Sequence, residues 1–269
     1  MIEKNKHFLN IVFRVILTSV GAVLEILAIS LIFNLTVELN FLISVISLIL
    51  IIYSWDFYQE YSYQIGKKQA NLIIVFLLIT IGLFFLSLSL SSSIAVSVTF
   101  LLLFFMGLFY NVYFKKLSSK IIGFKDFFVT ACWSTLILLF FLYTNKTDVK
   151  PMMFFLAFVF TRDFTNIVFC DLKDESADKK KKIQTVAGLL GTAKTIRLLL
   201  LVGFLSGIII LSGVLLNVLP EISYFLLIPV FLTSLFILNS HRIKHFSPSV
   251  VDFEYFNWFV FAVIGKLIL

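Results

Sequence analysis

The sequence is poor in charged residues and in cysteine, and each shortage excludes a class of protein. Only 14% of its 269 residues are Asp, Glu, Lys or Arg, too few for the surface of a soluble domain. Cys132 and Cys170 are far apart and lack metal-ligand spacing, so we expect two small buried side chains and no disulfide. No nucleic-acid-binding motif accompanies the net charge of +7.

Apolar residues dominate instead. The chain is 60% hydrophobic, has a mean hydropathy of +1.05 and contains 33 phenylalanines. Several apolar runs exceed the roughly 18 residues that a helix needs to cross a bilayer. We predict an all-α polytopic membrane bundle, a single domain over residues 1–269 with about nine transmembrane helices around a cytoplasm-facing central cavity. The expected spans are 11–35, 41–64, 72–90, 94–113, 123–143, 152–170, 196–216, 222–239 and 253–269.

The basic residues predict the orientation of these spans. With nine spans, the N-terminus and the loops after spans two, four, six and eight share one side of the membrane. All Lys and Arg residues except Lys146, Lys150 and Lys266 lie toward that side, which the positive-inside rule makes cytoplasmic. The positive charge therefore indicates topology and contact with anionic membrane lipids. The inner loops also carry most of the polar residues, so we expect the functional site at the cytoplasmic face.

The segment 162–191 holds the densest charge in the chain. Five of its acidic residues precede four consecutive lysines. If the helix continues through Asp178, the steps of three and four between Asp171, Asp174 and Asp178 stack three carboxylates on one face. Like charges at this spacing repel by a few tenths of a kcal/mol per pair. They are reasonable if a hard divalent cation binds there, and we predict Mg²⁺ holding a phosphate ligand.

A second cluster of polar residues lies at the end of the second expected span. Asp56, Glu60, Tyr63 and Lys67 fall within about 40° of one another on a helix. Asp56 and Glu60 could hold a second metal ion, with Tyr63 and Lys67 contacting substrate. The alternative is an interfacial belt, in which aromatic residues favour the membrane boundary and an acid pairs with Lys67.

The loop after span four adds Tyr110, Asn111, Lys116 and Lys125. Lysines near acidic clusters suit a diphosphate, which needs metal and direct cationic partners. Ordinary positive-inside lysines are the alternative for each of them.

Ionisable residues also lie deep within the spans. Glu25 is in the middle of span one, and Arg162 and Asp163 lie inside span six, where a charge costs about 2.5–3.5 kcal/mol. Each must face a polar cavity or a partner. A structural role and a role in substrate binding both stay open for Arg162 and Asp163, and Asn166 is a further candidate substrate contact.

The run Cys170-Asp171-Leu-Lys-Asp174-Glu-Ser-Ala-Asp178, with Thr185 and Gly191 after it, resembles the second aspartate-rich motif of the UbiA-type intramembrane prenyltransferases. That motif reads D-x-x-D-x-x-x-D, followed by a threonine and a glycine. The first motif of the family, N-D-x-x-D or N-R-x-x-D, is altered here. Asp56 stands at the asparagine position, Phe57 where Asp or Arg is usual, and Glu60 at the aspartate position.

The resemblance implies Mg²⁺-dependent transfer of an isoprenyl group from a prenyl diphosphate to an aromatic or lipid-like acceptor. Asp171, Asp174 and Asp178 would bind one Mg²⁺, and Asp56 and Glu60 a second. The altered first motif leaves open a catalytically weak homologue that binds prenyl lipid. An ion-coupled transporter using the intramembrane charges is a third hypothesis, disfavoured because Gly/Pro-interrupted helices in paired positions are missing.

Overall fold

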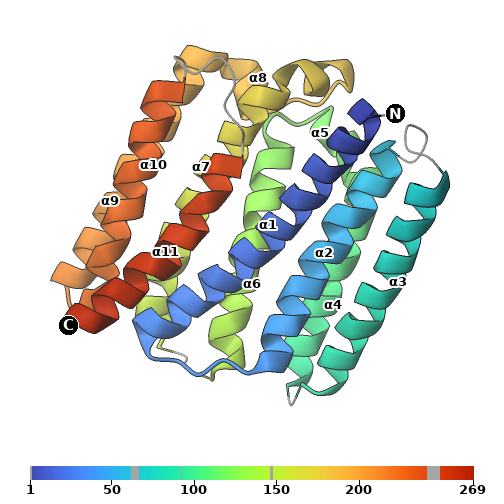
Figure 1. Ribbon diagram of the computed structural model, residues 1–269. Coiled ribbons are helices and arrows are strands. Elements are labelled where there is room, and N and C mark those ends of the chain that lie inside the picture. Colours follow the sequence, from blue (N-terminus) through green and yellow to red (C-terminus); the bar gives the residue numbers. More distant parts are fainter. Residues whose placement is uncertain (1, 62–66, 92, 146–147, 241–248) are drawn as a thin grey trace. The chain divides into compact units, whose positions relative to one another are not determined.

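The computed structural model describes residues 2–61, 67–91, 93–145, 148–240 and 249–269, and all regular structure within these ranges is helical (Figure 1). The helices, with η1 a π-helical turn and η2 a 3₁₀-helix, are α1 Ile2–Phe33, α2 Leu39–Tyr61, α3 Lys67–Ser89, α4 Ile94–Phe109, η1 Tyr110–Phe114, α5 Lys115–Ser118, α6 Phe124–Tyr143, α7 Val149–Lys180, α8 Val186–Leu190, α9 Thr192–Leu215, η2 Glu221–Leu226, α10 Leu227–Asn239 and α11 Ser249–Ile268.

The helices confirm an all-α polytopic membrane protein. Among the described residues, seven helical segments are long and apolar enough to cross a bilayer, and Ile94–Phe109 is a shorter apolar helix. The seven are Val12–Phe33, Leu39–Gln59, Gln69–Ser89, Phe124–Tyr143, Val149–Ser176, Thr192–Leu215 and Glu221–Asn239. Together with the shorter α4 and with α11, these segments overlap the expected spans.

Some boundaries differ from those expected, for local reasons. The α-helix expected over 94–113 ends at Phe109 and continues as the π-helical turn η1. The helix expected over 222–239 begins as the 3₁₀-helix η2, and α10 follows from Leu227. Pro229 lies in the first turn of α10, where its missing N–H leaves no helical hydrogen bond unmade.

The chain divides into two compact units. The first contains residues 1–23 and 37–112, in which α2 packs against α3 and α4. Phe84 of α3 lies against Phe100 and Phe104 of α4. The hydroxyl groups of Ser44 and Ser87 are 2.8 Å apart and join α2 to α3. Small polar groups of this kind link membrane helices because no water competes for them.

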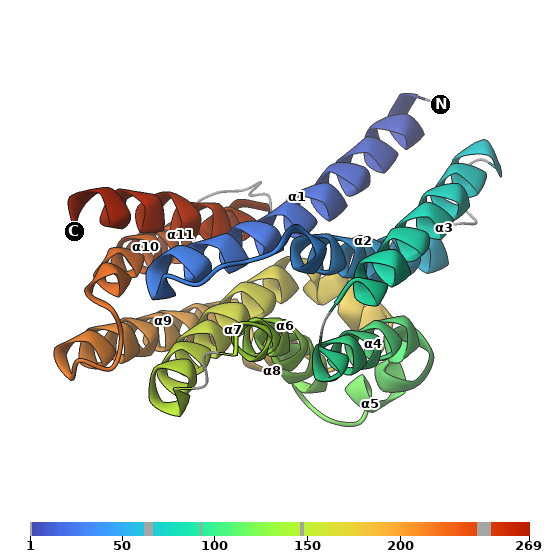
Figure 2. The ribbon, with the colours of Figure 1, turned by 90° about the horizontal axis from the view of Figure 1, so that it is seen from below.

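The second unit contains residues 24–36 and 113–269 and is built around α7. This helix packs against α6 on one side and α9 on the other (Figure 2), and it also contacts α8 and α11. Phe155, Phe158 and Phe169 of α7 are fully buried, and Phe158 stacks obliquely on Trp258 of α11. Where α7 is enclosed by other helices, its buried polar side chains must find partners inside the protein.

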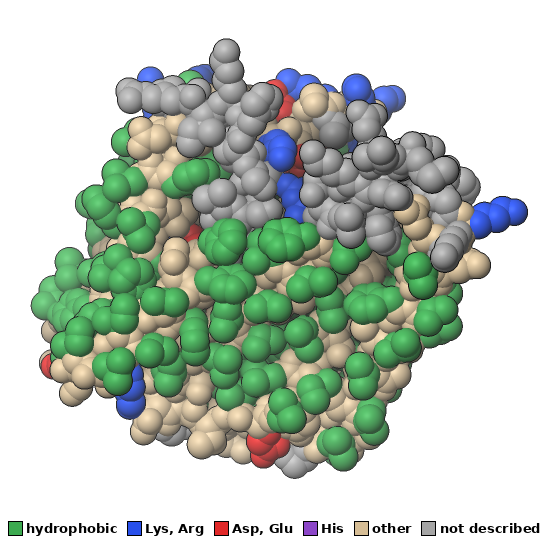
Figure 3. Space-filling model, in the orientation of Figure 1, with side chains coloured by type: hydrophobic (Ala, Val, Ile, Leu, Met, Phe, Trp, Pro, Cys, Tyr) green, Lys and Arg blue, Asp and Glu red, His purple; other side chains and the backbone are tan. Residues whose placement is uncertain are grey.

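Large apolar side chains are exposed on many helices, and they cover much of the face seen in Figure 3. Leu78 in the first unit, and Phe204 and Phe231 in the second, are more than half exposed. A soluble protein of this size rarely exposes so much apolar surface, whereas acyl chains solvate it.

Candidate functional site

The three predicted metal ligands lie on one continuous helix. α7 runs from Val149 to Lys180 and therefore carries Asp171, Asp174 and Asp178 on one face. Asp171 is 3% exposed and Asp178 is 6% exposed, whereas Asp174 is exposed. Two carboxyl groups are thus buried in the second unit, and the third lies at its surface.

A lysine from another helix joins the two buried aspartates. Lys125 Nζ donates hydrogen bonds to Asp171 Oδ1 at 2.8 Å and to Asp178 Oδ2 at 3.0 Å. Lys125 lies in the first turn of α6, and 22% of its side chain is exposed. One ammonium group is therefore the hydrogen-bonded cationic partner of two buried carboxyl groups. Burial of an ionised carboxyl group requires such a partner.

The chain leaves α7 through a turn that is fixed by backbone hydrogen bonds. Lys182 adopts a positive φ of 57°, and the Ile183 N–H donates to the Asp178 carbonyl oxygen at 2.9 Å. Thr185 then caps α8, because its hydroxyl accepts the Gly188 N–H at 3.0 Å. Gly191 follows with a φ of 72°, a conformation that favours glycine. Thr185 and Gly191 therefore stabilise the backbone conformation of the segment that follows the aspartate motif.

This turn is also joined to the loop that precedes α6. The Gln184 N–H donates to the Ser118 carbonyl oxygen and the Gly123 N–H donates to the Gln184 carbonyl oxygen, both at 2.8 Å. The Gln184 side chain donates to the Ser119 carbonyl oxygen at 2.9 Å. These bonds hold the start of α6, and with it Lys125, beside the end of α7.

Asp126 is a further acidic residue at this place. It is fully buried, and its Oδ2 accepts the Val186 N–H at 2.8 Å. Its carboxyl group lies beside that of Asp171. Among the described residues, no donor reaches Asp126 Oδ1 or Asp171 Oδ2. Asp126 is not among the site residues expected from the sequence, where its only signal is an acidic residue directly after Lys125.

The chemistry of these groups fits a divalent cation. Carboxylate oxygens are the ligands that Mg²⁺ prefers, and two buried oxygens without a donor require a positive partner. As the side chains lie, no three His, Cys, Asp or Glu residues in the described ranges are grouped to hold a metal ion. Lys125 instead supplies the positive charge between Asp171 and Asp178.

Asp178 lies just beyond Val149–Ser176, the part of α7 that is long and apolar enough to cross a membrane. Burial raises the pKa of its carboxyl group above the ordinary value, and the nearby Lys125 ammonium opposes that shift. Metal binding there would work in the same direction as Lys125, because any neighbouring cation favours the ionised carboxylate.

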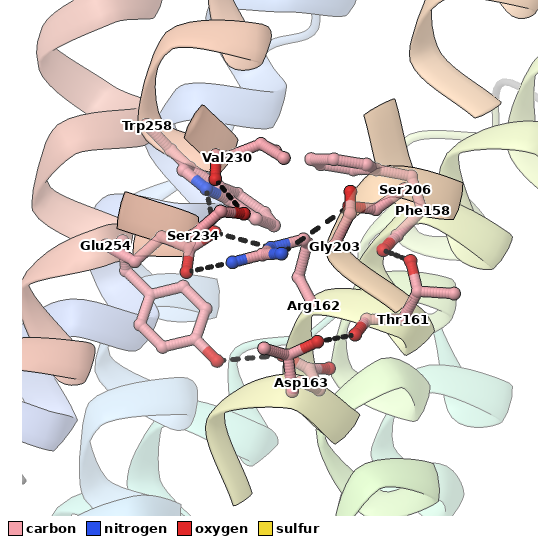
Figure 4. Close-up of polar contacts among 12 residues, drawn as sticks. Phe158, Thr161, Arg162, Asp163, Gly203, Ser206, Val230, Ser234, Glu254 and Trp258 are labelled. Carbon is pink, nitrogen blue, oxygen red and sulfur yellow. Dashed lines mark hydrogen bonds and ion pairs between the residues drawn. The ribbon is translucent and has the colours of Figure 1, made fainter. Parts of the chain in front are cut away.

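Arg162 lies nine residues before Asp171, about 13 Å away along the α7 axis, and belongs to a different cluster (Figure 4). Its Nε and Nη2 atoms donate to the two carboxylate oxygens of Glu254, each at 2.7 Å. Trp258 Nε1 donates to Glu254 Oε1 at 3.2 Å. Arg162 and Glu254 are essentially inaccessible to solvent. This bidentate pair ties α7 to α11.

The neighbouring residues extend this cluster. Asp163 accepts hydrogen bonds from the Tyr255 hydroxyl at 2.8 Å and from the Ser134 hydroxyl at 3.2 Å. Asn166 is buried beside Tyr255. Glu25 is also buried, and no donor among the described residues reaches its Oε1. The structure thus gives Arg162 and Asp163 partners on other helices, and the substrate-binding role of Arg162, Asp163 and Asn166 stays a prediction.

The first aspartate-rich motif belongs to the other unit. Asp56 lies partly exposed on α2, and Lys67 begins α3 with an exposed side chain. Phe57, at the position where the family usually has Asp or Arg, is buried. The Glu60 side chain and all of Tyr63 lie outside the described residues. A second metal site at Asp56 and Glu60 therefore stays a prediction.

The polar element after the fourth span forms a short irregular helix. Tyr110 and Asn111 are in the π-helical turn η1, a form that is frequent at functional sites. The Asn111 side chain lies outside the described residues, and Lys116 is exposed on α5. Their contact with a diphosphate stays a prediction.

Comparison with known proteins identifies the family. The UbiA prenyltransferase family matches residues 61–261, about three quarters of the chain. The chain belongs to the UbiA prenyltransferase family. No curated protein sequence matched it.

Solved structures of other UbiA proteins share the fold. A UbiA homologue from Archaeoglobus fulgidus bound to GPP and Mg²⁺ is 12% identical, with a TM-score of 0.65 over 95% of this chain and 99% of the homologue. An apo UbiA homologue from Aeropyrum pernix K1 is also 12% identical, with a TM-score of 0.60 over 96% of this chain and 97% of that one. A digeranylgeranylglyceryl phosphate synthase is 14% identical, with a TM-score of 0.61 over 94% of each chain.

The Arg162–Glu254 pair predicts a large effect on stability. Glu254→Ala leaves the Arg162 guanidinium buried without its carboxylate, and we expect the free energy of unfolding to fall by about 3–5 kcal/mol. Denaturant titration in detergent micelles measures this loss. Glu175→Ala is the matched control, because it removes an acid that pairs with Lys179 at the surface, and it should cost at most about 1 kcal/mol. Equal losses for both variants would contradict the pairing.

Proposed function

We propose that this UbiA-family protein transfers an isoprenyl group from a prenyl diphosphate to an aromatic or lipid-like acceptor within the membrane, in a Mg²⁺-dependent reaction. The observation that carries the proposal is the acidic site of α6 and α7, in which Asp171 and Asp178 share Lys125 and two buried carboxyl oxygens have no donor within the part of the chain that the structure describes. A UbiA homologue from Archaeoglobus fulgidus with the same fold binds GPP and Mg²⁺, and also DMAPP and Mg²⁺, which supports the donor class.

The second aspartate-rich motif would hold the metal ion. Asp171 and Asp178 provide buried carboxylates, and Asp174 adds an exposed one on the same helix face. When bound, Mg²⁺ would supply positive charge that stabilises the leaving diphosphate. Asp56 and Glu60 are the proposed ligands of a second ion.

Protein cations would complete the neutralisation of the diphosphate. Lys125 lies at the motif, and its ammonium can donate to phosphate oxygens as it now donates to carboxylates. Lys116, Lys67, Tyr63, Tyr110 and Asn111 are further proposed contacts. Charge that develops on the diphosphate as the allylic C–O bond ionises would be stabilised by these donors. The acceptor atom then forms the new bond to the allylic carbon and loses a proton.

The distribution of basic residues supports a cytoplasmic site. Lys67, Lys116, Lys125 and the lysines 179–182 lie at the helix ends that the positive-inside rule assigns to the cytoplasm. A diphosphate donor is highly charged and reaches such a site from the aqueous phase on that side.

Asp174 provides the sharpest test of catalysis, because its exposed side chain can be changed without opening the core. In Asp174→Asn, we expect Mg²⁺-dependent release of diphosphate from a labelled prenyl diphosphate panel to fall by at least about 100-fold, as for loss of a group that stabilises transition-state charge. Expression and thermal stability should be unchanged.

Glu175→Gln is the control for this test, since it neutralises the next residue of the same helix. It should keep most of the activity. Full activity in Asp174→Asn would remove this aspartate from the mechanism. Binding of the donor without turnover in the unmodified protein would favour the catalytically weak homologue.

The proposed topology is tested separately. With nine spans, reporters fused to the two ends of the chain should lie on opposite sides of the membrane, the N-terminal one in the cytoplasm and the C-terminal one outside. Reporter pairs that are active only on one side of the membrane measure this. Two cytoplasmic signals would show that the number of spans is even.

A further inference from the structure

The Lys125 ammonium group lies between two carboxyl groups of the second aspartate-rich motif, where a metal ion would bind. Its Nζ atom contacts Asp171 Oδ1 and Asp178 Oδ2 at 2.8 Å and 3.0 Å. Both carboxyl groups are buried, and both are proposed metal ligands. A metal ion that used these same oxygens would meet the ammonium group at short range, and two like charges repel strongly in a poorly solvated place.

We propose that Lys125 neutralises Asp171 and Asp178 when no metal ion is bound, and that the divalent metal therefore binds tightly only together with a diphosphate. This inference rests on the proposed function and concerns the same site. A bare metal ion must displace the ammonium group and brings no anion that could receive it. A metal–diphosphate complex brings phosphate oxygens that receive the displaced ammonium group as the metal takes over its carboxylates.

The local structure allows this exchange to occur without movement of a helix. The backbone around Lys125 is held by the Gly123 N–H and by the contact of Asp126 with Val186. The side chain itself is 22% exposed, and its four-carbon stem and single charged group can rotate to another anion. The ammonium group can therefore leave the aspartates while α6 stays in place.

A neighbouring carboxyl group strengthens the need for a positive charge at this site. Asp126 is fully buried beside Asp171, and Asp126 Oδ1 and Asp171 Oδ2 have no donor among the described residues. Removal of the ammonium group would leave Asp171 and Asp178 without their shared cation, with Asp126 close to Asp171. Loss of one partner from a buried ionic group is strongly unfavourable, so departure of Lys125 is coupled to arrival of the metal.

The experiment measures metal binding by the full chain in nanodiscs, with Mn²⁺ as the probe and inorganic pyrophosphate as the anion. In the unmodified protein, we expect pyrophosphate to tighten Mn²⁺ binding by about tenfold or more, within the usual range of coupling between two ligands. In Lys125→Met, bare Mn²⁺ should bind about tenfold more tightly than to the unmodified protein, and the gain from pyrophosphate should shrink by the same factor.

Lys179→Met is the matched control. It removes one positive charge near the motif, from an exposed lysine that pairs with Glu175, and it should leave both Mn²⁺ affinities unchanged. Equal gains in Lys179→Met and Lys125→Met would overturn the proposal, because general electrostatics would then account for both. Bare Mn²⁺ binding that is the same in Lys125→Met and in the unmodified protein would also overturn it.

Two further measurements keep the proposal testable if Lys125→Met does not fold. Lys125→Arg retains a cation and should keep bare Mn²⁺ binding weak; tight binding in that variant would count against the proposal. Mn²⁺ binding to the unmodified protein that pyrophosphate does not change would refute it directly. The proposed function fails separately: coupled binding without prenyl transfer contradicts the transferase alone, whereas prenyl transfer without coupling contradicts the role of Lys125 alone.

Discussion

Buried carboxyl groups need a positive partner, and much of the second unit is arranged to provide one. Lys125 forms ion pairs with Asp171 and Asp178, and Arg162 forms one with Glu254. In a chain with so few charges, four of these five groups are buried, and only the Lys125 side chain is partly exposed. Breaking such a pair costs far more than a surface ion pair contributes. The packing of α6, α7 and α11 must therefore preserve these contacts.

α7 carries both clusters and connects them mechanically. The Arg162–Glu254 pair and the contact of Asp163 with Tyr255 tie the middle of α7 to α11. Further along α7, Asp171 lies about two and a half turns beyond Arg162 and Asp178 about four and a half turns beyond it, and both contact Lys125 of α6. A helix is rigid over this length, so the deep ion pair also fixes the position at which the aspartates are presented. A structural role for Arg162 and Asp163 would therefore support the site without contact with substrate, and their role in substrate binding stays a prediction.

Asp126 shows how a site residue can be inconspicuous in the sequence. One acidic residue beside a lysine, after a glycine, is an ordinary way to begin a helix, because acids favour the first turn. Its importance comes from the hydrogen bond to the Val186 N–H and from its position beside Asp171. Glu254 is similar, since an acid near the start of a membrane span suggests an interfacial residue. Neither pattern indicates a partner.

The membrane class, the approximate spans and the row of aspartates on α7 can be predicted from the amino-acid sequence alone. These features depend on local hydropathy and on a helical period of 3.6 residues, which neighbouring residues encode. The pairing of the charges became visible in the folded protein, because Lys125 is 46 residues from Asp171 and Arg162 is 92 residues from Glu254. Such pairs depend on how separate helices pack, and no local pattern of residues specifies that packing.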